Sequence, residues 1–288
     1  LPKIIKFNKK LLLNVDVVFA ALPNGESQKI SKFLLKKNIL IDLSADFRLK
    51  KDSDYFKWYK IKHKAKNMIK NSIYALPEFK RNNIKNNKII SCPGCYPTSI
   101  LLPLAPLLKK KLISHNNIIV DSKSGYSGAG RNVHKKYKNK NLYESLSAYG
   151  IAIHRHNSEI QQELNLYYGK NVNFQFTPHL TPMFRGILST IYIDLKRNVT
   201  MAKVNSALNK YFKKDTFVNI AKPNTLLSTN SVLNTNNCII SVCQSKFKNK
   251  LIILSVIDNL MKGGSGQAVQ NMNLIFNFKE TEGLNVKN

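Results

Sequence analysis

The first part of the chain has the hydrophobic pattern of a parallel sheet whose strands alternate with helices. An apolar run rich in valine at residues 15–22 ends in Pro23-Asn24-Gly25, which predicts a buried strand followed by a turn. Residues 26–37 carry apolar side chains at helical spacing, and residues 39–43 form the next apolar run. A further run at 89–91 leads directly into Cys92-Pro93-Gly94-Cys95. Strand, helix and strand in this order predict a doubly wound α/β sheet.

The second part of the chain has longer apolar runs that alternate with polar residues. These runs lie at residues 118–121, 174–177, 187–195, 238–243 and 251–256. The polar segment 244–250 joins the last two and predicts an antiparallel hairpin with one buried face. We therefore expect a second domain of α+β type with a mostly antiparallel sheet.

A helix is predicted near the end of the chain, at residues 267–276, because apolar residues share one face there. It follows Gly263-Gly264-Ser265-Gly266, in which Ser265 or Gly266 is placed to cap the helix start. We expect this helix to return to the first domain. The predicted division is therefore residues 1–93 with 260–288 for the first domain and 94–259 for the second.

The composition excludes several classes of protein but does not by itself indicate the function. Lys and Arg number 46 against 16 Asp and Glu, a net charge of +30, but only 6 of the basic residues are arginine. Scattered lysine indicates a solvated surface and not specific nucleic-acid recognition, which usually relies on arginine, so a basic RNA-binding protein is the weaker alternative. The 4 cysteines are too few for a disulfide scaffold, and the longest wholly apolar run, residues 100–108, is too short for a membrane span. We expect a cytoplasmic protein without a membrane partner.

Cys95 is the strongest candidate for a catalytic residue. It follows the Pro93-Gly94 turn after a buried strand and precedes Tyr96-Pro97, where proline suits the first turn of a helix. A cysteine at the positive end of a helix dipole is expected to have a lowered pKa. This position predicts a nucleophile. Pro103 lies inside the apolar helix that follows and predicts a kinked or shortened helix.

The cysteines allow three other interpretations. Cys92 and Cys95 form a Cys-Pro-Gly-Cys sequence that a redox dithiol could use, although such thiol oxidoreductases are small and lack a second domain of this size. A zinc site would also need Cys238 and Cys243, whose spacing in a strand points their side chains to opposite faces, so we predict no metal site. A buried, inert thiol at Cys95 is the third alternative.

A second group of candidate residues consists of His154 and His156 on either side of Arg155, with Glu159 three residues further on. Histidines of this kind provide a general base and acid, while the arginine binds an anion. Each histidine alone would more often be a surface residue. In an extended segment the two histidines share a face and in a helix they diverge, so the spacing leaves open which one transfers a proton.

A third group lies in residues 121–131, where glycines and hydroxyl residues end in Arg131 after a predicted strand. This pattern is typical of a loop that binds an anion. Arginine is rare in the chain, yet Arg48, Arg131, Arg155 and Arg185 all lie in motif-like segments. Because arginine provides a planar fork for carboxylate or phosphate, we expect Arg131, Arg155 and Arg185 to bind substrate.

Taken together, these segments resemble the N-acetyl-gamma-glutamyl-phosphate reductase family, which is related in fold to aspartate-semialdehyde dehydrogenase. The matching segments are residues 22–25, 42–48, 74–78, 93–98, 124–131, 154–156 with 159–160, 176–180 with 185–186, and 263–268. They occur in the order found in the family and extend over most of the chain. The match at Pro93-Gly94-Cys95-Tyr96-Pro97-Thr98 is the family's nucleophile signature, with Cys92 where the family usually has asparagine.

The resemblance implies an enzyme that reduces an acyl phosphate with NADPH through a cysteine thioester, in arginine biosynthesis. Cys95 would be the nucleophile, and His154 or His156 the acid and base. The implied fold is a Rossmann-like dinucleotide-binding domain and an α+β domain for catalysis and oligomerisation, in a dimer or tetramer. A related reductase for aspartyl or aminoadipyl phosphate is the alternative, since only the substrate pocket would differ.

The resemblance also implies where the cofactor NADP binds. The family's opening strand and Gly-rich pyrophosphate turn have no counterpart here, so we expect a chain truncated at its N-terminus, with weakened NADPH binding. We expect Asn24 and Gly25 to border the nicotinamide half, together with Gly263, Gly264, Ser265 and Gly266, because the start of a helix offers free N–H groups.

Overall fold

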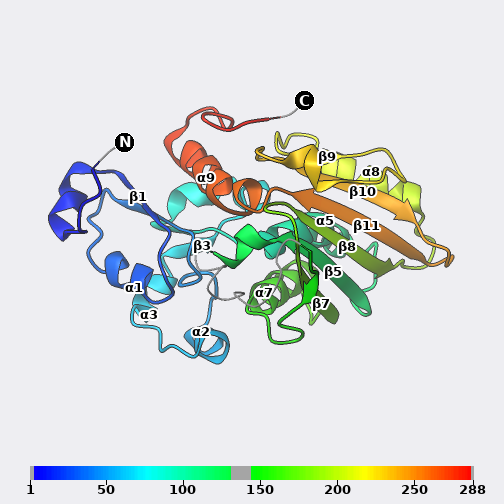
Figure 1. The fold of residues 1–288 in the computed structure, drawn as a ribbon, viewed down its shortest axis with the longest axis horizontal. Coiled ribbons are helices and arrows are strands. Elements are labelled where there is room, and N and C mark those ends of the chain that lie inside the picture. The colour runs from blue at the N-terminus through cyan, green and yellow to red at the C-terminus, as the bar shows by residue number, and fades with distance from the viewer. Residues whose placement is uncertain (1–2, 131–143, 287–288) are drawn as a thin grey trace.

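The computed structural model describes residues 3–130 and 144–286, which form a four-stranded and a seven-stranded sheet (Figure 1). The smaller sheet has the order β1-β2-β4-β3, and its strands are all parallel. These strands are β1 (Val17–Ala20), β2 (Ile39–Asp42), β3 (Ser72–Tyr74) and β4 (Ile89–Ser91). The helices around them include α1 (Glu26–Ser31), α2 (Asp52–Tyr59), α3 (Lys66–Ile69) and α4 (Pro77–Lys80). The predicted parallel α/β unit is confirmed.

Helix α1 is shorter than the pattern predicts, because it ends at Ser31 and not at residue 37. The side chain of Asn38 accounts for this difference. Its carbonyl oxygen accepts a hydrogen bond from the Leu35 N–H at 2.8 Å, and its amide donates to the carbonyls of Leu12 and Val15. The buried asparagine thus binds the Leu35 N–H, which a longer helix would have paired, and ties this turn to the segment before β1.

The larger sheet has the order β6-β7-β5-β8-β11-β10-β9. Its strands are β5 (Ile118–Gly125), β6 (Ser147–Ala148), β7 (Phe174–Thr181), β8 (Ile187–Asp194), β9 (Val218–Ile220), β10 (Cys238–Gln244) and β11 (Lys250–Ile257). The pairs β5 with β7 and β9 with β10 are parallel, and the other four pairs are antiparallel. This confirms the mostly antiparallel sheet and the predicted hairpin of β10 and β11.

Strand β5 continues through the first part of residues 121–131, the segment predicted to be an anion-binding loop. Residues 121–125 pair with β7, residues 121–124 pair with β8 as well, and only Tyr126–Ala129 form a 3₁₀ turn. The side chains of Ser122 and Ser124 are buried between the sheet and its helices. The nest predicted over the whole of 121–131 is therefore wrong for its first five residues, because pairing on both sides keeps the backbone extended.

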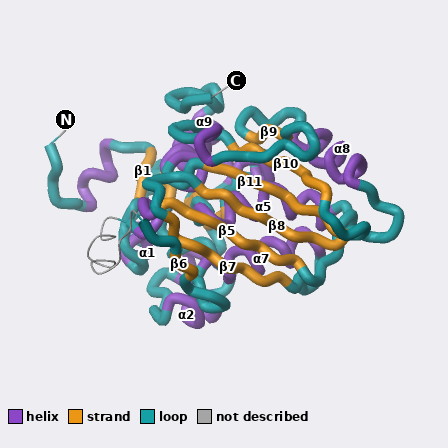
Figure 2. The backbone as a smooth tube through the Cα atoms, turned by 45° about the vertical axis from the view of Figure 1, so that its right-hand side comes forward, coloured by secondary structure: helices purple, strands orange, loops and turns teal. Residues whose placement is uncertain are grey.

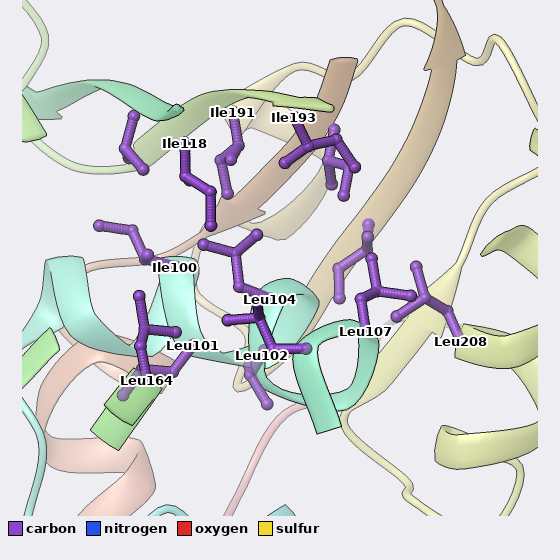
Figure 3. Packing of buried hydrophobic residues seen from close by; sticks show 14 of the residues in the cluster. Ile100, Leu101, Leu102, Leu104, Leu107, Ile118, Leu164, Ile191, Ile193 and Leu208 are labelled. Atoms are coloured by element: carbon purple, nitrogen blue, oxygen red, sulfur yellow. The ribbon is translucent and has the colours of Figure 1, made fainter. Parts of the chain in front are cut away.

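The main core lies between the larger sheet and three helices on one of its faces (Figure 2). These helices are α5 (Cys95–Lys109), α7 (His156–Tyr168) and α8 (Met201–Phe212). Alternate residues of β5 and β8 point toward the helices, as the burial pattern of both strands shows. Figure 3 shows Leu104 of α5 close to Ile118 and Ile191 of the sheet, within one apolar cluster.

Pro103 does not shorten α5, although the sequence predicts a kink or an early end. The helix runs to Lys109 and contains Pro106 as well. Each internal proline removes one backbone hydrogen bond, at a cost of about 3 kcal/mol. Every residue from 96 to 108 is buried, so the packing of α5 between the sheet and the other helices outweighs this cost.

The last helix, α9 (Gly266–Phe276), returns to the first sheet as predicted (Figure 1). Ala268 is buried in one apolar cluster with Ile41 and Ile90 from the strands β2 and β4. Met272 packs against the same cluster. The first sheet is therefore covered by a helix that lies more than 170 residues after it in the sequence.

Candidate active site

A cavity of about 480 Å³ lies where the smaller sheet meets the larger one. The carboxyl ends of β1, β2 and β4 reach it, which is the edge of a parallel sheet where ligands bind in open α/β folds. Residues after these strands line it: Leu22, Asn24, Leu43, Ser44, Ala45, Arg48, Tyr59, Cys95 and Tyr96. The second domain contributes Ser124, Gly128, Ala129, Gly130, Tyr149, His154, Arg155, His156 and Leu180.

Cys95 is the first residue of α5, as predicted, and its side chain lines this cavity. Gly94 precedes it at the helix cap. A Cβ atom built on Gly94 would lie only 2.4 Å from Nε2 of His156, closer than any real contact, so the ring of His156 packs directly on the backbone before the nucleophile. The glycine at this position is therefore required for close approach.

The prediction that Cys95 has a lowered pKa is wrong. Burial in the cavity wall raises the pKa of the Cys95 thiol to about 11, and backbone N–H groups at the helix start lower it only partly. Desolvation of a thiolate thus outweighs the helix dipole at this site. The unliganded protein therefore holds Cys95 mainly as the neutral thiol at pH 7, and thiolate formation needs a base.

This pKa predicts how Cys95 reacts with iodoacetamide. Because the thiolate fraction of a group with a pKa near 11 grows with pH, the labelling rate should rise about tenfold per pH unit between about pH 7 and about pH 9.5. Rates measured by mass mapping of the labelled peptide check this. A rate that levels off below about pH 8 would mean that the helix start lowers the pKa of the Cys95 thiol more than burial raises it.

The two histidines lie together at the cavity, at the start of α7. Their ring centroids are 4.7 Å apart, and Nδ1 of His154 accepts a hydrogen bond from the His156 N–H at 3.2 Å. Burial, with the positive charges of Arg48 and Arg155, lowers the pKa of His156 well below its usual range. His156 is therefore a neutral imidazole at neutral pH, which allows it to accept a proton.

Glu159 is a buried carboxylate that joins the two domains behind the nucleophile. Its Oε1 accepts from Arg48 at 2.9 Å, and its Oε2 accepts from the Gly94 N–H at 3.0 Å and the Tyr74 hydroxyl at 3.1 Å. The His156 Nε2 lies 3.8 Å from Oε1. Glu159 thus holds both the turn before Cys95 and the arginine of the first domain.

The three arginines expected to bind substrate have different positions. Arg155 lines the cavity. Arg185 is not among the residues that line it, because its guanidinium lies 3.2 Å from the Asp258 carboxylate and also donates to Asn234. Arg131 lies outside the described residues. The structure therefore places Arg155 at the cavity and Arg185 beside a buried carboxylate.

Asn24 lines the cavity, and the neighbouring turn is fixed from the first domain. The N–H of Gly25 donates to Oδ1 of Asp46 at 2.7 Å, and Gly25 has a left-handed backbone with φ of 93°. This turn follows β1 directly. It therefore presents Asn24 at the carboxyl edge of the parallel sheet, where the cofactor was expected.

The expectation of free N–H groups is wrong for Gly263, Ser265 and Gly266. A π-helical turn at Met261–Ser265 precedes α9, and within it only Gly264 has non-helical backbone angles. The N–H groups of Gly263, Ser265 and Gly266 donate to the carbonyls of Asp258, Leu260 and Met261. Gly263 nevertheless lies at the site, because a Cβ built on it would be 2.7 Å from Cβ of Cys95.

Sequence reasoning missed three tyrosines that line the cavity, Tyr59, Tyr96 and Tyr149. The Tyr149 hydroxyl donates to that of Tyr96 at 3.1 Å, which in turn donates to the carbonyl of His179 at 3.2 Å. Two of them could have been found from the sequence, because Tyr96 directly follows the candidate nucleophile Cys95 and Tyr149 lies five residues before His154. No pattern marked Tyr59, which ends helix α2.

The described residues also bear on the redox and zinc interpretations of the cysteines. All four thiols are free, and burial raises the pKa of Cys92 to about 12. Across residues 3–130 and 144–286, no three His, Cys, Asp or Glu side chains form a group that could hold a metal ion. In the same ranges no helix combines the length and apolar character needed to span a membrane.

Comparison with known protein families matches both parts of the chain. Residues 3–87 match the NAD binding domain of semialdehyde dehydrogenase, and residues 95–259 match its dimerisation domain. Two solved structures share the fold, each with a TM-score of 0.68 over 94% of this chain. Aspartate semialdehyde dehydrogenase II from Vibrio cholerae is 16% identical and is covered over 82% of its length. Aspartate semialdehyde dehydrogenase from Francisella tularensis is 15% identical and is covered over 84% of its length.

Other proteins have a much higher sequence identity to this chain than these two structures have. The N-acetyl-gamma-glutamyl-phosphate reductase of Clostridium novyi is 45% identical over 98% of this chain and 81% of its own length. The probable chloroplastic N-acetyl-gamma-glutamyl-phosphate reductase of Arabidopsis thaliana is 42% identical over 99% of this chain and 71% of its own length. With this similarity across both domains, the chain belongs to the N-acetyl-gamma-glutamyl-phosphate reductase family, whose fold is that of the semialdehyde dehydrogenases.

Proposed function

We propose that the protein reduces N-acetyl-gamma-glutamyl phosphate to N-acetylglutamate semialdehyde with NADPH, releasing phosphate, as a step of arginine biosynthesis. The observation that carries the proposal is Cys95 at a helix start, in a cavity that also holds His156 and Arg155. Relatives at 42–46% identity carry this name, which supports the substrate. The four free thiols fit a reducing compartment such as the cytoplasm.

The first step forms a thioester. The Cys95 sulfur attacks the carbonyl carbon of the acyl phosphate, the carbon–oxygen bond to phosphate breaks, and phosphate leaves. Because the pKa of Cys95 is raised by burial, the thiol proton must pass to a base, and neutral His156 is placed to take it. Arg155 supplies positive charge for the anionic substrate and the leaving phosphate.

The second step reduces the thioester. Bound nicotinamide supplies the hydride for this step. The carbon–sulfur bond then breaks, the aldehyde leaves, and Cys95 recovers its proton from the histidine. Asn24 lines the same cavity as Cys95, so it would border a cofactor bound there. The backbone of Gly263 packs directly against Cβ of Cys95, and this close packing requires a glycine.

His156 is proposed as the proton relay in preference to His154. Its ring packs on Gly94, the residue before Cys95, and it is 3.8 Å from the carboxylate of Glu159. The ring of His154 instead packs edge-on against Tyr96 and Tyr149. His154 therefore shapes the cavity wall, while His156 borders the nucleophile.

The test is phosphate-dependent reduction of NADP by N-acetylglutamate semialdehyde, with aspartate semialdehyde as the comparison. The proposal expects N-acetylglutamate semialdehyde to be the better substrate by at least about a hundredfold in kcat/KM. Equal rates with the two aldehydes would favour an aspartyl-phosphate reductase. The same assay with NAD in place of NADP tests the choice of cofactor.

Changing Arg155 to lysine should lower kcat/KM by more than about tenfold, because lysine keeps the charge but loses the planar fork. Arg185→Lys is the matched comparison and should stay near the wild-type rate, since its partner is Asp258. Steady-state kinetics of both variants check this. Arg131→Lys remains open to the same test.

We propose that two copies associate through the uncovered face of the larger sheet. Within residues 3–130 and 144–286, helices cover only its other face (Figure 2), and Ile119 and Tyr192 on the open face are 48% and 40% exposed. In this scheme residues 94–259 carry catalysis and association, and residues 1–93 with 260–288 bind the cofactor. Light scattering should give at least twice the 32.8 kDa mass of one chain, and Tyr192→Lys should weaken the association.

A further inference from the structure

Tyr59 is a residue of the first domain whose ring lies against an arginine of the second. It ends helix α2, is only 9% exposed, and lines the active-site cavity. The guanidinium carbon of Arg155 lies over its ring, 5.4 Å from the centroid. This distance is within the range of a cation–π interaction.

Tyr59 is itself held in one position by its neighbours. The ring of Tyr55 stacks on it, with centroids 4.8 Å apart and an angle of 16° between the planes. The Tyr55 hydroxyl donates to Oδ1 of Asp46 at 2.7 Å, the same oxygen that accepts from the Gly25 N–H. Contacts thus run from the turn at Asn24 and Gly25 to the ring that supports Arg155.

Arg155 has little else to fix it. It is exposed at the cap of α7, and no carboxylate of the described residues lies within ion-pair distance of it. A guanidinium that lies on an aromatic ring uses its flat face for that contact. Its N–H groups remain available along the edge, where carboxylate or phosphate binds.

We infer that Tyr59 is a positioning residue that holds the Arg155 guanidinium, through its ring face, for the anionic groups of the substrate. The inference rests on the proposed function, because it assumes that Arg155 binds an anionic group of the substrate. The ring carries this role and the hydroxyl does not. The first domain thereby contributes to substrate binding as well as to cofactor binding.

The test compares Tyr59→Leu, which removes the ring, with Tyr59→Phe, which keeps it. Tyr59→Leu should raise KM for the acyl phosphate about three- to tenfold while kcat and KM for NADPH stay within about twofold, and Tyr59→Phe should keep the wild-type KM. In an Arg155→Ala background, Tyr59→Leu should have no further effect on KM. Phe56→Leu, at an exposed aromatic residue of the same helix, is the matched control.

A binding measurement separates this inference from the proposed function. Inorganic phosphate should protect Cys95 from iodoacetamide, and Tyr59→Leu should raise the phosphate concentration for half protection about three- to tenfold, without any catalysis. Equal protection in wild type and Tyr59→Leu would overturn the inference, as would a Tyr59→Phe variant impaired as much as Tyr59→Leu. An enzyme inactive on the acyl phosphate but protected as described would refute only the proposed substrate. Thermal unfolding of each variant verifies that it is folded.

Discussion

Replacing Cys95 with serine should lower kcat for acyl transfer by at least about a thousandfold, because a serine hydroxyl ionises far less readily than a thiol and is a far weaker nucleophile. The residue is the cysteine that borders the cavity, at the first position of α5. Stopped-flow measurement of phosphate release in a single turnover checks the acylation step directly. Peptide mapping after iodoacetamide treatment should find Cys95 labelled before Cys92, which is more deeply buried and whose pKa burial raises to about 12.

Cys92→Ser provides the matched control. Cys92 is buried in an apolar cluster beside Ile41 and Ala268, and the amide nitrogen of Asn271 is 3.8 Å from its sulfur. This variant should retain most of the activity, with a loss of stability of about 1 kcal/mol from the buried hydroxyl. Activity that survives loss of Cys95 but not of Cys92 would reverse the assignment.

Glu159→Gln should lower the free energy of unfolding by about 3–5 kcal/mol, because it leaves the guanidinium of Arg48 buried without its counter-charge. The side chains of Glu159 and Arg48 are 0% and 9% exposed. Glutamine can still accept the Gly94 N–H but cannot neutralise Arg48. Because that contact sets the turn before Cys95, kcat should fall as well.

Denaturant unfolding of wild type and variant measures this loss. The exposed pair of Glu26 and Lys29 is the control, with side chains 45% and 56% exposed, and Glu26→Gln should change stability by less than about 1 kcal/mol. A Glu159→Gln protein within about 1 kcal/mol of wild type would show that the buried pair contributes no more than the exposed one.

The strands and the helix start at Cys95 could be predicted because their signals are local. A run of β-branched residues indicates a buried strand wherever it lies, and the Pro-Gly turn before Cys95 precedes a helix in the structure as expected. The pKa of Cys95 could not be predicted in the same way, because it depends on how far the cavity wall buries the thiol. The local helix start indicates a lowered pKa, whereas the tertiary environment raises it.

Contacts between residues far apart in the sequence account for the other predictions that were wrong or were not made. Arg48 and Glu159 are 111 residues apart, so no sequence pattern pairs them. Arg185 resembles Arg155 in its motif-like surroundings, but Asp258 lies beside it only in the folded chain. The N–H groups at residues 263–266 were expected to be free because glycine and serine often start helices, and the π-helical turn that pairs three of them leaves no mark in the sequence.

The position of α9 has a consequence for how the chain folds as it leaves the ribosome. The strands of the first sheet are synthesised early, but the helix that covers them is made only after the whole second domain. At about 5–20 residues per second, the apolar face around Ile41 and Ile90 waits about ten seconds or more for Ala268 and Met272. Throughout that interval the nascent first domain exposes a surface that a chaperone or a neighbouring nascent chain can bind, so its native packing is completed only after translation has passed α9.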